Sequence, residues 1–308
     1  MNKDSPHFPA LCGVVVIFHP EEPVVQNVLA MIKECGELIV VDNGSSPEIR
    51  ARLNGLSGST VIELRENIGV AAALNIGAAR AMNKGFLWIV TFDQDSCPEP
   101  GMVATLWAAH LRRPQAALVV PCIAEGAESL GRYRWVRPHP RFPGLFQRIP
   151  CLDNDVSGII MAVTSGSLTE LSVWADLGGF DEGLFIDYVD TDFCLKVIDS
   201  GREILVAAGA ILKHKLGNRR DIELFGYSFH PTFHPPFRHY YMTRNRIQIW
   251  RRYACRMPHW ALFDLMFFGF NLFRVIAFED QKGLKIQAVL RGTWDGLLGK
   301  SGKTRLFD

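Results

Sequence analysis

Short apolar runs alternate with helical patterns over the first two-thirds of the chain. Four β-branched apolar runs predict buried strands, at residues 13–18, 38–42, 60–64 and 86–92. Two segments between them carry apolar side chains at helical spacing, residues 22–35 and 70–82. Strands that are apolar on both faces are typical of a parallel sheet covered by helices. The pattern therefore predicts an α/β fold with a mainly parallel central sheet flanked by helices.

The pattern changes after about residue 225, where aromatic residues, arginines and long helical stretches become frequent. We therefore expect an α/β domain over residues 1–225 and a C-terminal helical region over residues 226–308. Within the first part, residues 131–150 hold five arginines, four prolines and no acidic residue. Such a segment is typical of a long basic loop that serves as a lid or a binding loop.

The longest apolar stretch, residues 260–278, is interrupted by Asp264, Asn271 and Arg274. A charge near the middle of a membrane span costs about 2.5–3.5 kcal/mol on insertion scales, so we do not expect this segment to span. Two arrangements fit it equally well. It lies on a membrane surface as an amphipathic helix, or it packs over the first domain or in a homo-oligomer.

Composition narrows the classes of protein. The 308 residues are 48% hydrophobic with a formal net charge of +1, which argues against a nucleic-acid partner because phosphate neutralisation needs a basic excess. The seven cysteines are scattered, which indicates thiols in a reducing compartment rather than a disulfide framework or zinc site. Residues 1–10 contain no apolar core of a signal peptide, so we expect a cytoplasmic location.

Polar clusters follow the predicted strands. Ligands of parallel sheets bind at the carboxyl ends of the strands. The clusters are residues 42–45, 65–67 and 93–95, together with His214 after a later apolar run at residues 204–212. Asp93 and Asp95, two residues apart on a turn before a helix start predicted at Ser96 and Pro98, can share Mg²⁺ or Mn²⁺. Alone, this pattern also fits a solvated turn, and a lone His214 also fits a surface or core residue.

Four further positions have both a chemical and a structural interpretation. Asp42 can accept the N3–H of a uracil or thymine ring, and the same turn can cap a helix through Ser45. Asn67 and Gly69 open a helix whose first N–H groups favour an anion, or they form an ordinary cap. Asp187 and Asp190 share a helix face and can include a general base, or they are first-turn aspartates. Arg244 can clamp a phosphate, or it lies on a solvated helix face.

In their order along the chain, these segments resemble inverting family 2 glycosyltransferases of the GT-A fold. The matching segments are residues 14–18, 41–45, 67–69, 93–95 and 179–192. The segments that are similar to bacterial rhamnosyltransferases are residues 92–96, 185–192, 240–245 and 294–297. The resemblance covers nearly the whole chain. A dinucleotide-binding dehydrogenase does not fit, because residues 19–22 are His-Pro-Glu-Glu where that fold has its glycine-rich turn.

The resemblance implies a role for each motif. Asp190 is the catalytic base, although Val189 stands where the family usually has a preceding Glu. Asp95 and His214 hold Mg²⁺ or Mn²⁺. The residues implied for nucleotide-sugar binding are Phe18, Asp42, Asn43, Asn67, Gly69, Asp93, Gln94 and Arg244. The residues implied for the acceptor side are Ser165, Gly166, Asp187 and Asp192.

The implied activity is inverting transfer of a sugar by a catalytic domain over residues 1–225. The resemblance indicates L-rhamnose from dTDP-L-rhamnose as the donor and a glycolipid or lipid-linked saccharide as the acceptor, at the cytoplasmic face of the inner membrane. The product would belong to lipopolysaccharide of O-antigen type or to rhamnolipid. One alternative keeps the fold and uses a UDP-hexose. Another is a scaffold that binds a nucleotide sugar without turnover, against which the intact Asp95, Asp190 and His214 argue.

Overall fold

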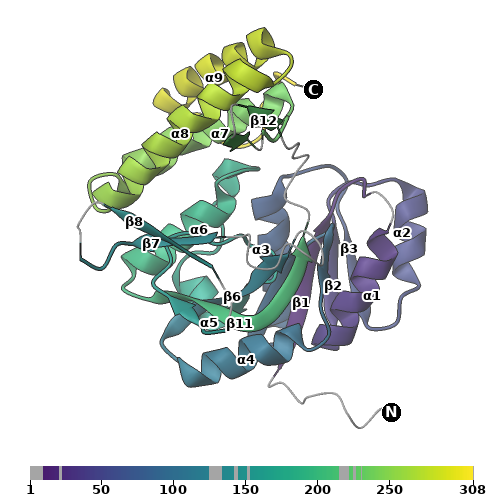
Figure 1. Cartoon of the computed structure of the whole chain (residues 1–308). Helices are drawn as coiled ribbons and strands as arrows, with labels where there is room; N and C mark the ends of the chain where they lie inside the picture. Colours follow the sequence, from purple (N-terminus) through teal and green to yellow (C-terminus); the bar gives the residue numbers. More distant parts are fainter. Residues whose placement is uncertain are drawn as a thin grey trace. The chain divides into compact units, whose positions relative to one another are not determined.

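The computed structural model describes residues 10–20, 23–124, 134–141, 145–150, 153–214, 222–224, 227–229 and 231–307 (Figure 1). The chain divides into two compact units. The first unit comprises residues 1–137, 148–182 and 189–214, and the second comprises residues 138–147, 183–188 and 215–308. This division assigns residues 138–147 and 183–188 to the second unit, whereas the predicted boundary at residue 225 leaves them in the first.

The first unit contains a nine-stranded sheet among the described residues, in the order β3-β2-β1-β4-β10-β6-β11-β5, with β9 beside β11. The strands are β1 (Leu11–Ile17), β2 (Leu38–Asp42), β3 (Ser59–Glu63), β4 (Trp88–Asp93), β5 (Ser96–Pro98), β6 (Ala116–Ala124), β9 (Val156–Ser157), β10 (Leu168–Glu170) and β11 (Glu203–His214). β1 to β4 pair in parallel, as do β6 and β11, whereas β5, β9 and β10 are antiparallel. The predicted mainly parallel sheet is confirmed.

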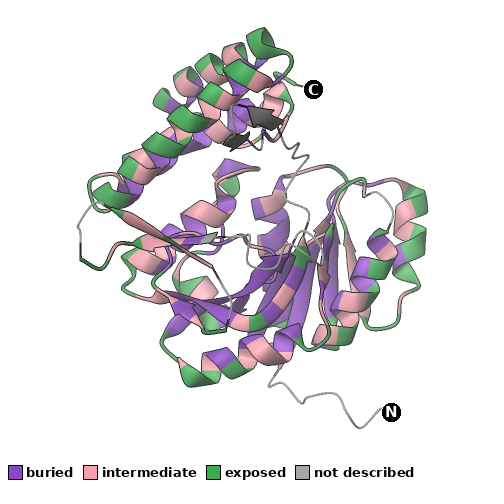
Figure 2. Cartoon of the chain, viewed as in Figure 1, coloured by how far each residue is buried: buried purple, intermediate pink, exposed green. Residues whose placement is uncertain are grey.

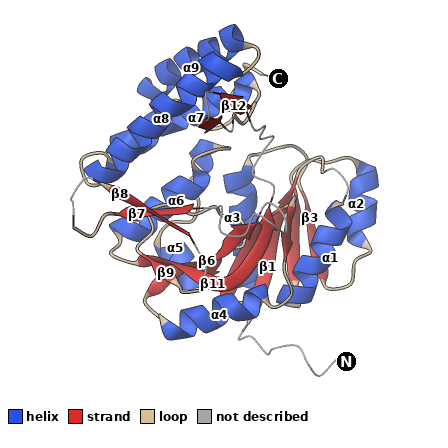
Figure 3. Cartoon of the chain, viewed as in Figure 1, coloured by secondary structure: helices blue, strands red, loops and turns tan. Residues whose placement is uncertain are grey.

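Helices flank this sheet (Figure 3). They are α1 (Val24–Cys35), α2 (Pro47–Asn54), α3 (Val70–Asn83), α4 (Met102–Arg112), α5 (Leu171–Asp176) and α6 (Val189–Asp199), with a 3₁₀ turn at Glu182–Leu184. The central strands β1, β2 and β4 are almost entirely buried (Figure 2). Small residues let α3 lie close to β1, since a Cβ at Gly77 would stand 2.3 Å from Val14 Cγ1. This packing fixes the carboxyl ends of the strands.

The second unit is mainly helical, as expected for the C-terminal region. Its helices are α7 (Pro236–Tyr253), α8 (Pro258–Phe278) and α9 (Lys282–Leu297), with the short strands β12 (Ile222–Leu224) and β13 (Tyr227–Phe229). α9 packs on α7 through glycines: a Cβ at Gly292 would lie 2.5 Å from the Tyr240 carbonyl oxygen, and one at Gly296 2.8 Å from that of Arg244. α8 is long and apolar enough to cross a membrane by length and composition alone.

Two expectations from the sequence need correction. Residues 131–150 do not form a loop throughout, because they include the strands β7 (Arg134–Pro138) and β8 (Phe146–Pro150), which pair with each other. Five cysteines are free thiols as expected, but Cys122 is disulfide-bonded. Both errors have the same cause: pairing between segments is decided by the fold and leaves little trace in local composition.

Candidate functional site

Two carboxylates and an imidazole meet at the carboxyl end of β4. β4 ends at Asp93, Asp95 follows in the turn, and β11 ends at His214. One ligand atom from each residue lies within 4.8 Å of those of the other two. The Asp93 and Asp95 side chains are 45% and 48% exposed, so a ligand can reach them from solvent. Three of the residues predicted for the donor and metal thus come together.

The short strand β5 explains how His214 reaches the aspartates. β5 runs antiparallel to the end of β11, in a register that sets His214 opposite Ser96. The helix start predicted at Ser96 and Pro98 is therefore wrong, and α4 begins only at Met102. A strand of three residues has no periodicity that a sequence can display, and its pairing with a distant strand stabilises it.

Two buried serines link the cluster to the core. Ser96 Oγ lies 2.8 Å from His214 Nδ1 and 2.7 Å from Ser165 Oγ, and both serines are 0% exposed. Ser165 Oγ also accepts the backbone N–H of Asp93 at 3.0 Å. When Nδ1–H of His214 donates to Ser96, the other ring nitrogen, Nε2, is unprotonated and can bind a cation.

Ser165 and Gly166, predicted for the acceptor side, lie behind the aspartates. The Ser165 hydroxyl belongs to the buried network behind the aspartates. Gly166 occupies a tight turn with φ of 78°, and a Cβ there would lie 2.5 Å from Pro121 Cγ. In this structure both residues support the cluster from its buried side, and their acceptor-side role stays a prediction.

The donor set of Asp93, Asp95 and His214 fits a divalent cation. Mg²⁺ and Mn²⁺ prefer oxygen ligands, commonly share them with substrate phosphates, and Mn²⁺ also accepts imidazole. His214 Nε2 lies 3.8 Å from the Asp93 carboxylate, and adjacent ligands of one such ion stand about 3 Å apart. Small side-chain rotations therefore suffice to close the three groups around an ion.

Asp42 is the most enclosed of the predicted nucleotide contacts. Its side chain is fully buried at the end of β2. One carboxylate oxygen accepts the Ser45 N–H at 2.9 Å and the other accepts Arg50 Nε at 2.6 Å. A carboxylate offers about four acceptor positions, so Asp42 keeps capacity for one more donor. A base N–H at Asp42 would therefore lie beside the Arg50 guanidinium.

Amide side chains tie the neighbouring strand-end loops together. Asn43 Nδ2 donates to Asn67 Oδ1 at 3.1 Å, and Asn67 Oδ1 also accepts the Gly69 N–H at 2.9 Å. Gly69 has φ of 94° where α3 begins, a conformation that favours glycine. On the other side, Gln94 Oε1 accepts the Phe18 N–H at 2.8 Å. Five of the predicted nucleotide residues thus lie in two hydrogen-bonded groups at the strand ends, which together are called the rim: Asn43, Asn67 and Gly69 in one and Phe18 with Gln94 in the other.

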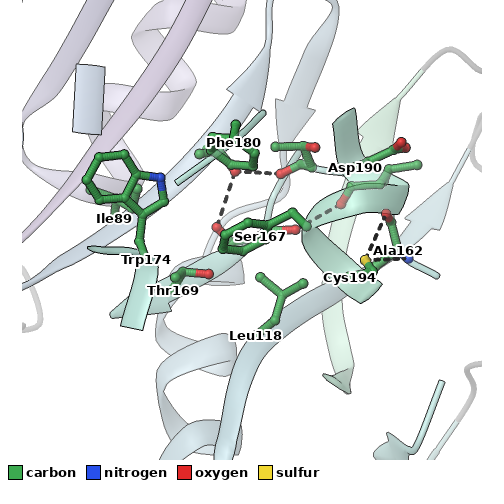
Figure 4. A pocket seen from close by; sticks show the side chains of 13 residues that line it. Ile89, Leu118, Ala162, Ser167, Thr169, Trp174, Phe180, Asp190 and Cys194 are labelled. Carbon is green, nitrogen blue, oxygen red and sulfur yellow. Dashed lines mark hydrogen bonds between the residues drawn. The ribbon is translucent and has the colours of Figure 1, made fainter. Parts of the chain in front are cut away.

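Asp190 lies in the first turn of α6 and lines a small cavity of about 10 Å³ (Figure 4). Thr91 and Thr164 line the same cavity, and the Thr91 hydroxyl donates to the Thr164 carbonyl oxygen at 2.6 Å. Thr164 directly precedes Ser165, whose hydroxyl accepts the Asp93 N–H. One segment therefore contacts both the cavity and the cluster of Asp93, Asp95 and His214. Burial, and then the charge of Asp190, raise the pKa of the Cys194 thiol to about 12, which keeps this neighbour a neutral thiol.

Asp192, predicted for the acceptor side, is buried in α6. Its side chain is 0% exposed and lies 3.3 Å from Lys196 Nζ, one turn further along α6. Lys196 also donates to the Gly179 carbonyl oxygen at 2.8 Å. In this structure Asp192 anchors α6 through Lys196, and its acceptor-side role stays a prediction. Spacing along the helix separates Asp192 from Asp190 but does not tell which of the two is buried.

Arg244 belongs to the second unit, where it is 1% exposed. Its guanidinium donates to Asn245 Oδ1 and to three backbone carbonyl oxygens, those of Gly302 at 2.5 Å, Gly183 at 3.1 Å and Leu184 at 3.1 Å. The ring of Tyr241 lies 4.8 Å below it. In this structure Arg244 holds the backbone of its own unit, and its role as a phosphate clamp stays a prediction.

The segment that Arg244 contacts has an unusual backbone. Phe185, Asp187 and Tyr188 all have φ between 61° and 64°, which is costly for side chains other than glycine. Asn245 Nδ2 lies 2.8–2.9 Å from the carbonyl oxygens of residues 184, 186 and 187. Asp187, predicted for the acceptor side, instead pairs with Arg238. This held segment leads directly into α6 and, two residues later, Asp190.

Four residues with structural roles in one or the other unit have no role predicted from the sequence. Ser96 and Asn245 stand next to Asp95 and Arg244, so adjacency to a motif was the available signal. Arg50 and Asn75 are helix residues with no such signal. Asn75 exchanges hydrogen bonds of 2.9 Å with the backbone of Phe180, which fixes the segment before residue 183.

Comparison with known proteins decides the family. The model of glycosyl transferase family 2 matches residues 13–170, about half of the chain. The chain belongs to glycosyl transferase family 2. The match runs from β1 to β10 and includes the Asp42 loop and the Asp93–Asp95 turn. The predicted family and enzyme class, a glycosyltransferase, are confirmed.

Two related proteins match this chain over different lengths. The dTDP-rhamnosyl transferase RfbF of Shigella flexneri is 26% identical over 298 residues, covering 95% of this chain and 97% of that protein. The galactofuranosyltransferase GlfT1 of Mycolicibacterium smegmatis (strain ATCC 700084 / mc(2)155) is 31% identical over 121 residues, covering 38% of this chain and 40% of that protein. The first likeness extends through the C-terminal helices of this family 2 enzyme.

Solved structures show the fold. GalNAc-T7 with UDP, GalNAc and Mn²⁺ superposes with a TM-score of 0.59 at 16% identity, over 80% of this chain and 48% of that one. S. aureus TarS 1-349 superposes with a TM-score of 0.57 at 14% identity, over 93% of this chain and 80% of that one. The predicted GT-A fold is confirmed.

Proposed function

We propose that this glycosyltransferase moves L-rhamnose from dTDP-L-rhamnose onto a hydroxyl group of a glycolipid or lipid-linked saccharide. The observation that carries the proposal is the cluster of Asp93, Asp95 and His214 at the carboxyl end of β4. It offers a cation site of the kind that binds a sugar-linked diphosphate. The choice of rhamnose is supported by RfbF, named a dTDP-rhamnosyl transferase, whose likeness covers 95% of the chain.

The loops around the cluster supply the donor site. Asp42 accepts the N3–H of the pyrimidine base, and the rim of Asn43, Asn67, Gly69, Phe18 and Gln94 borders the nucleotide. Asp95 and His214 hold Mg²⁺ or Mn²⁺, with Asp93 beside the ribose. The cation, when bound, neutralises charge on the departing diphosphate. The arrangement is supported by the shared position of these residues at the strand ends and by their hydrogen bonds.

Asp190 is the proposed general base. Its carboxylate takes the proton of the acceptor hydroxyl, and the acceptor oxygen forms a bond to the anomeric carbon. The bond from that carbon to the diphosphate oxygen breaks, and dTDP leaves with the electron pair. Because the attacking oxygen and the leaving oxygen are on opposite faces of the sugar, the configuration inverts. Positioned base catalysis of this kind contributes about 10²–10⁴-fold.

A donor other than dTDP-L-rhamnose is the second candidate. It is favoured by GlfT1, a galactofuranosyltransferase that shares 31% identity over 121 residues. A UDP-hexose would present the same N3–H to Asp42, because uracil and thymine share that group. The fully buried Asp42 carboxylate therefore recognises the pyrimidine and leaves the sugar to other residues.

A donor screen tests the proposal. Purified enzyme with Mg²⁺ or Mn²⁺ and a bacterial lipid extract is given dTDP-L-rhamnose or UDP-hexoses, and nucleotide release is measured. We expect release from dTDP-L-rhamnose and a lipid product heavier by one deoxyhexose in mass spectrometry. Faster turnover of a UDP-hexose would replace the proposed donor. Donor binding without release in any lipid extract would favour a scaffold without turnover.

A further inference from the structure

Helix α8 presents an apolar face that its own unit does not cover. Six large apolar side chains on it are each 47–54% exposed: Leu262, Leu265, Met266, Phe270, Phe273 and Ile276. They recur at intervals of three and four residues, so they lie along one side of the helix, together with Gly269 and Ala277. From Leu262 to Ala277 this face runs about 22 Å. Figure 2 shows exposed positions along α8.

The polar side chains that interrupt the apolar stretch of α8 are buried or half-buried. Asp264 is 5% exposed and accepts hydrogen bonds from Arg246 Nε at 2.8 Å, Trp250 Nε1 at 2.8 Å and the Tyr188 hydroxyl at 2.6 Å. Arg274 donates to Asn271 on the same helix. Asp264 is therefore buried in the unit, and the half-buried Arg274 lies at the edge of the outer face, 5.2 Å from the ring centre of Phe270. From Leu262 onward the exposed side chains of α8 are apolar, which fits a helix lying in an interface rather than crossing it.

Basic residues flank this face at both ends. Arg251, Arg252 and Arg256 precede α8 and are exposed, and Lys282 follows it. The exposed acid at these ends among the described residues is Asp280, which lies 3.0 Å from Lys285 Nζ. The two lysines and two acids after α8 balance each other, so the net positive charge lies before the helix, at Arg251, Arg252 and Arg256. This charge complements anionic lipid headgroups.

We infer that the outer face of α8 docks on an anionic lipid surface. The inference rests on the proposed function for the lipid character of the acceptor, and it names the surface that brings the enzyme to it. A second copy of the chain fits less well. Interfaces between subunits carry hydrogen bonds along with apolar contacts. Leu, Met, Phe, Ile, Gly and Ala offer no side-chain oxygen or N–H on this face, whereas acyl chains require none.

Vesicle co-sedimentation of the full chain tests this. Vesicles of phosphatidylcholine alone are compared with vesicles that also contain phosphatidylglycerol. We expect the wild type to pellet with the mixed vesicles. The Phe270→Asp/Phe273→Asp variant should lose about tenfold or more in partitioning, because two apolar anchors become charged. The matched control, Leu111→Asp, alters a leucine of α4 that is 61% exposed and should pellet like the wild type. Arg252→Gln/Arg256→Gln should reduce the preference for phosphatidylglycerol.

Two results would overturn the inference. One is a wild type that remains in the supernatant with both kinds of vesicle. The other is a dimer, measured by light scattering, that Phe270→Asp/Phe273→Asp makes monomeric without any vesicle binding by the wild type. Calorimetric titration with dTDP separates this from the proposed function. A wild type that pellets with mixed vesicles but binds neither dTDP nor UDP would retain the lipid surface and refute the donor.

Discussion

Replacing Arg244 by Ala distinguishes a structural arginine from a phosphate clamp. The buried guanidinium donates to three backbone carbonyl oxygens in its unit, and the substitution leaves them without this donor. A hydrogen bond from a charged group is worth about 1.5–3 kcal/mol. Because two of the three carbonyl contacts are only partly buried, water regains some of them. We expect a loss of about 3–5 kcal/mol in the free energy of unfolding.

The assay is urea unfolding together with calorimetric titration of dTDP. Arg251→Ala is the matched control, since Arg251 lies on the same helix, is exposed and makes one long hydrogen bond of 3.4 Å. We expect it to change stability by less than about 1 kcal/mol. If Arg244→Ala does not fold, Arg244→Lys replaces it and should lose less stability.

Donor affinity decides between the two roles of Arg244. In the structural role, dTDP binds the folded variant as it binds the wild type, while turnover falls because the segment leading to Asp190 is less well held. The reasoning would be refuted by an Arg244→Ala variant with wild-type stability and a dTDP affinity reduced tenfold or more. That outcome would return Arg244 to the diphosphate.

Three further predictions concern the cluster and the helical unit. Ser96→Ala should weaken Mn²⁺ binding about 10-fold, because hydrogen bonds from outside the metal site orient metal-binding histidines. Titration of Mn²⁺ by electron paramagnetic resonance measures this, with Ser59→Ala as the control. Equal Mn²⁺ affinities of Ser96→Ala and the wild type would contradict it. Asp42→Ala should weaken dTDP and UDP binding alike in calorimetry, whereas an effect on one nucleotide alone would exclude a shared N3–H contact. Burial, and then the charge of Arg238, lower the pKa of His234 to about 4. The folded state therefore keeps His234 neutral below pH 6.5, whereas the unfolded chain protonates it. Its contribution to the free energy of unfolding is full above pH 6.5 and falls by about 2 kcal/mol by pH 5. His234→Gln should flatten this dependence of the unfolding free energy on pH, and an unchanged dependence would exclude His234 as its cause.

The sequence predicted those parts of the fold that periodicity determines. The strands β1, β2, β3 and β4 fall within two residues of the predicted runs. The apolar side chains of β1, β2 and β4 are buried on both faces, whereas the edge strand β3 is half-buried and is indicated by its β-branched residues. The rule that ligands bind at the carboxyl ends of parallel strands correctly predicts Asp93 and His214 at the same edge of the sheet. Strand β5 was out of reach, since three residues stabilised by a distant partner have no pattern of their own.

The burial of polar side chains was not predictable from the sequence. The family resemblance implies ligand-facing roles for Arg244, Asp192 and Ser165, and a motif does not show whether its side chains are buried. Each is instead buried with partners distant in sequence or on a neighbouring turn. Helix α8 shows the opposite case, in which large apolar side chains are exposed. Asp264 and Arg274 interrupt the apolar stretch in the sequence, but Asp264 is buried in the unit and Arg274 is half-buried over the Phe270 ring, so large apolar side chains remain outside.

Turnover of the Asp190→Asn variant tests the central claim most directly. The variant and the wild type receive dTDP-L-rhamnose, Mn²⁺ and lipid extract, and the glycolipid product is quantified by mass spectrometry. Asparagine is nearly isosteric with aspartate but cannot take the acceptor proton. We predict a loss of about 10²-fold or more in product formation with unchanged dTDP affinity. A folded Asp190→Asn enzyme with wild-type turnover would contradict the proposed mechanism.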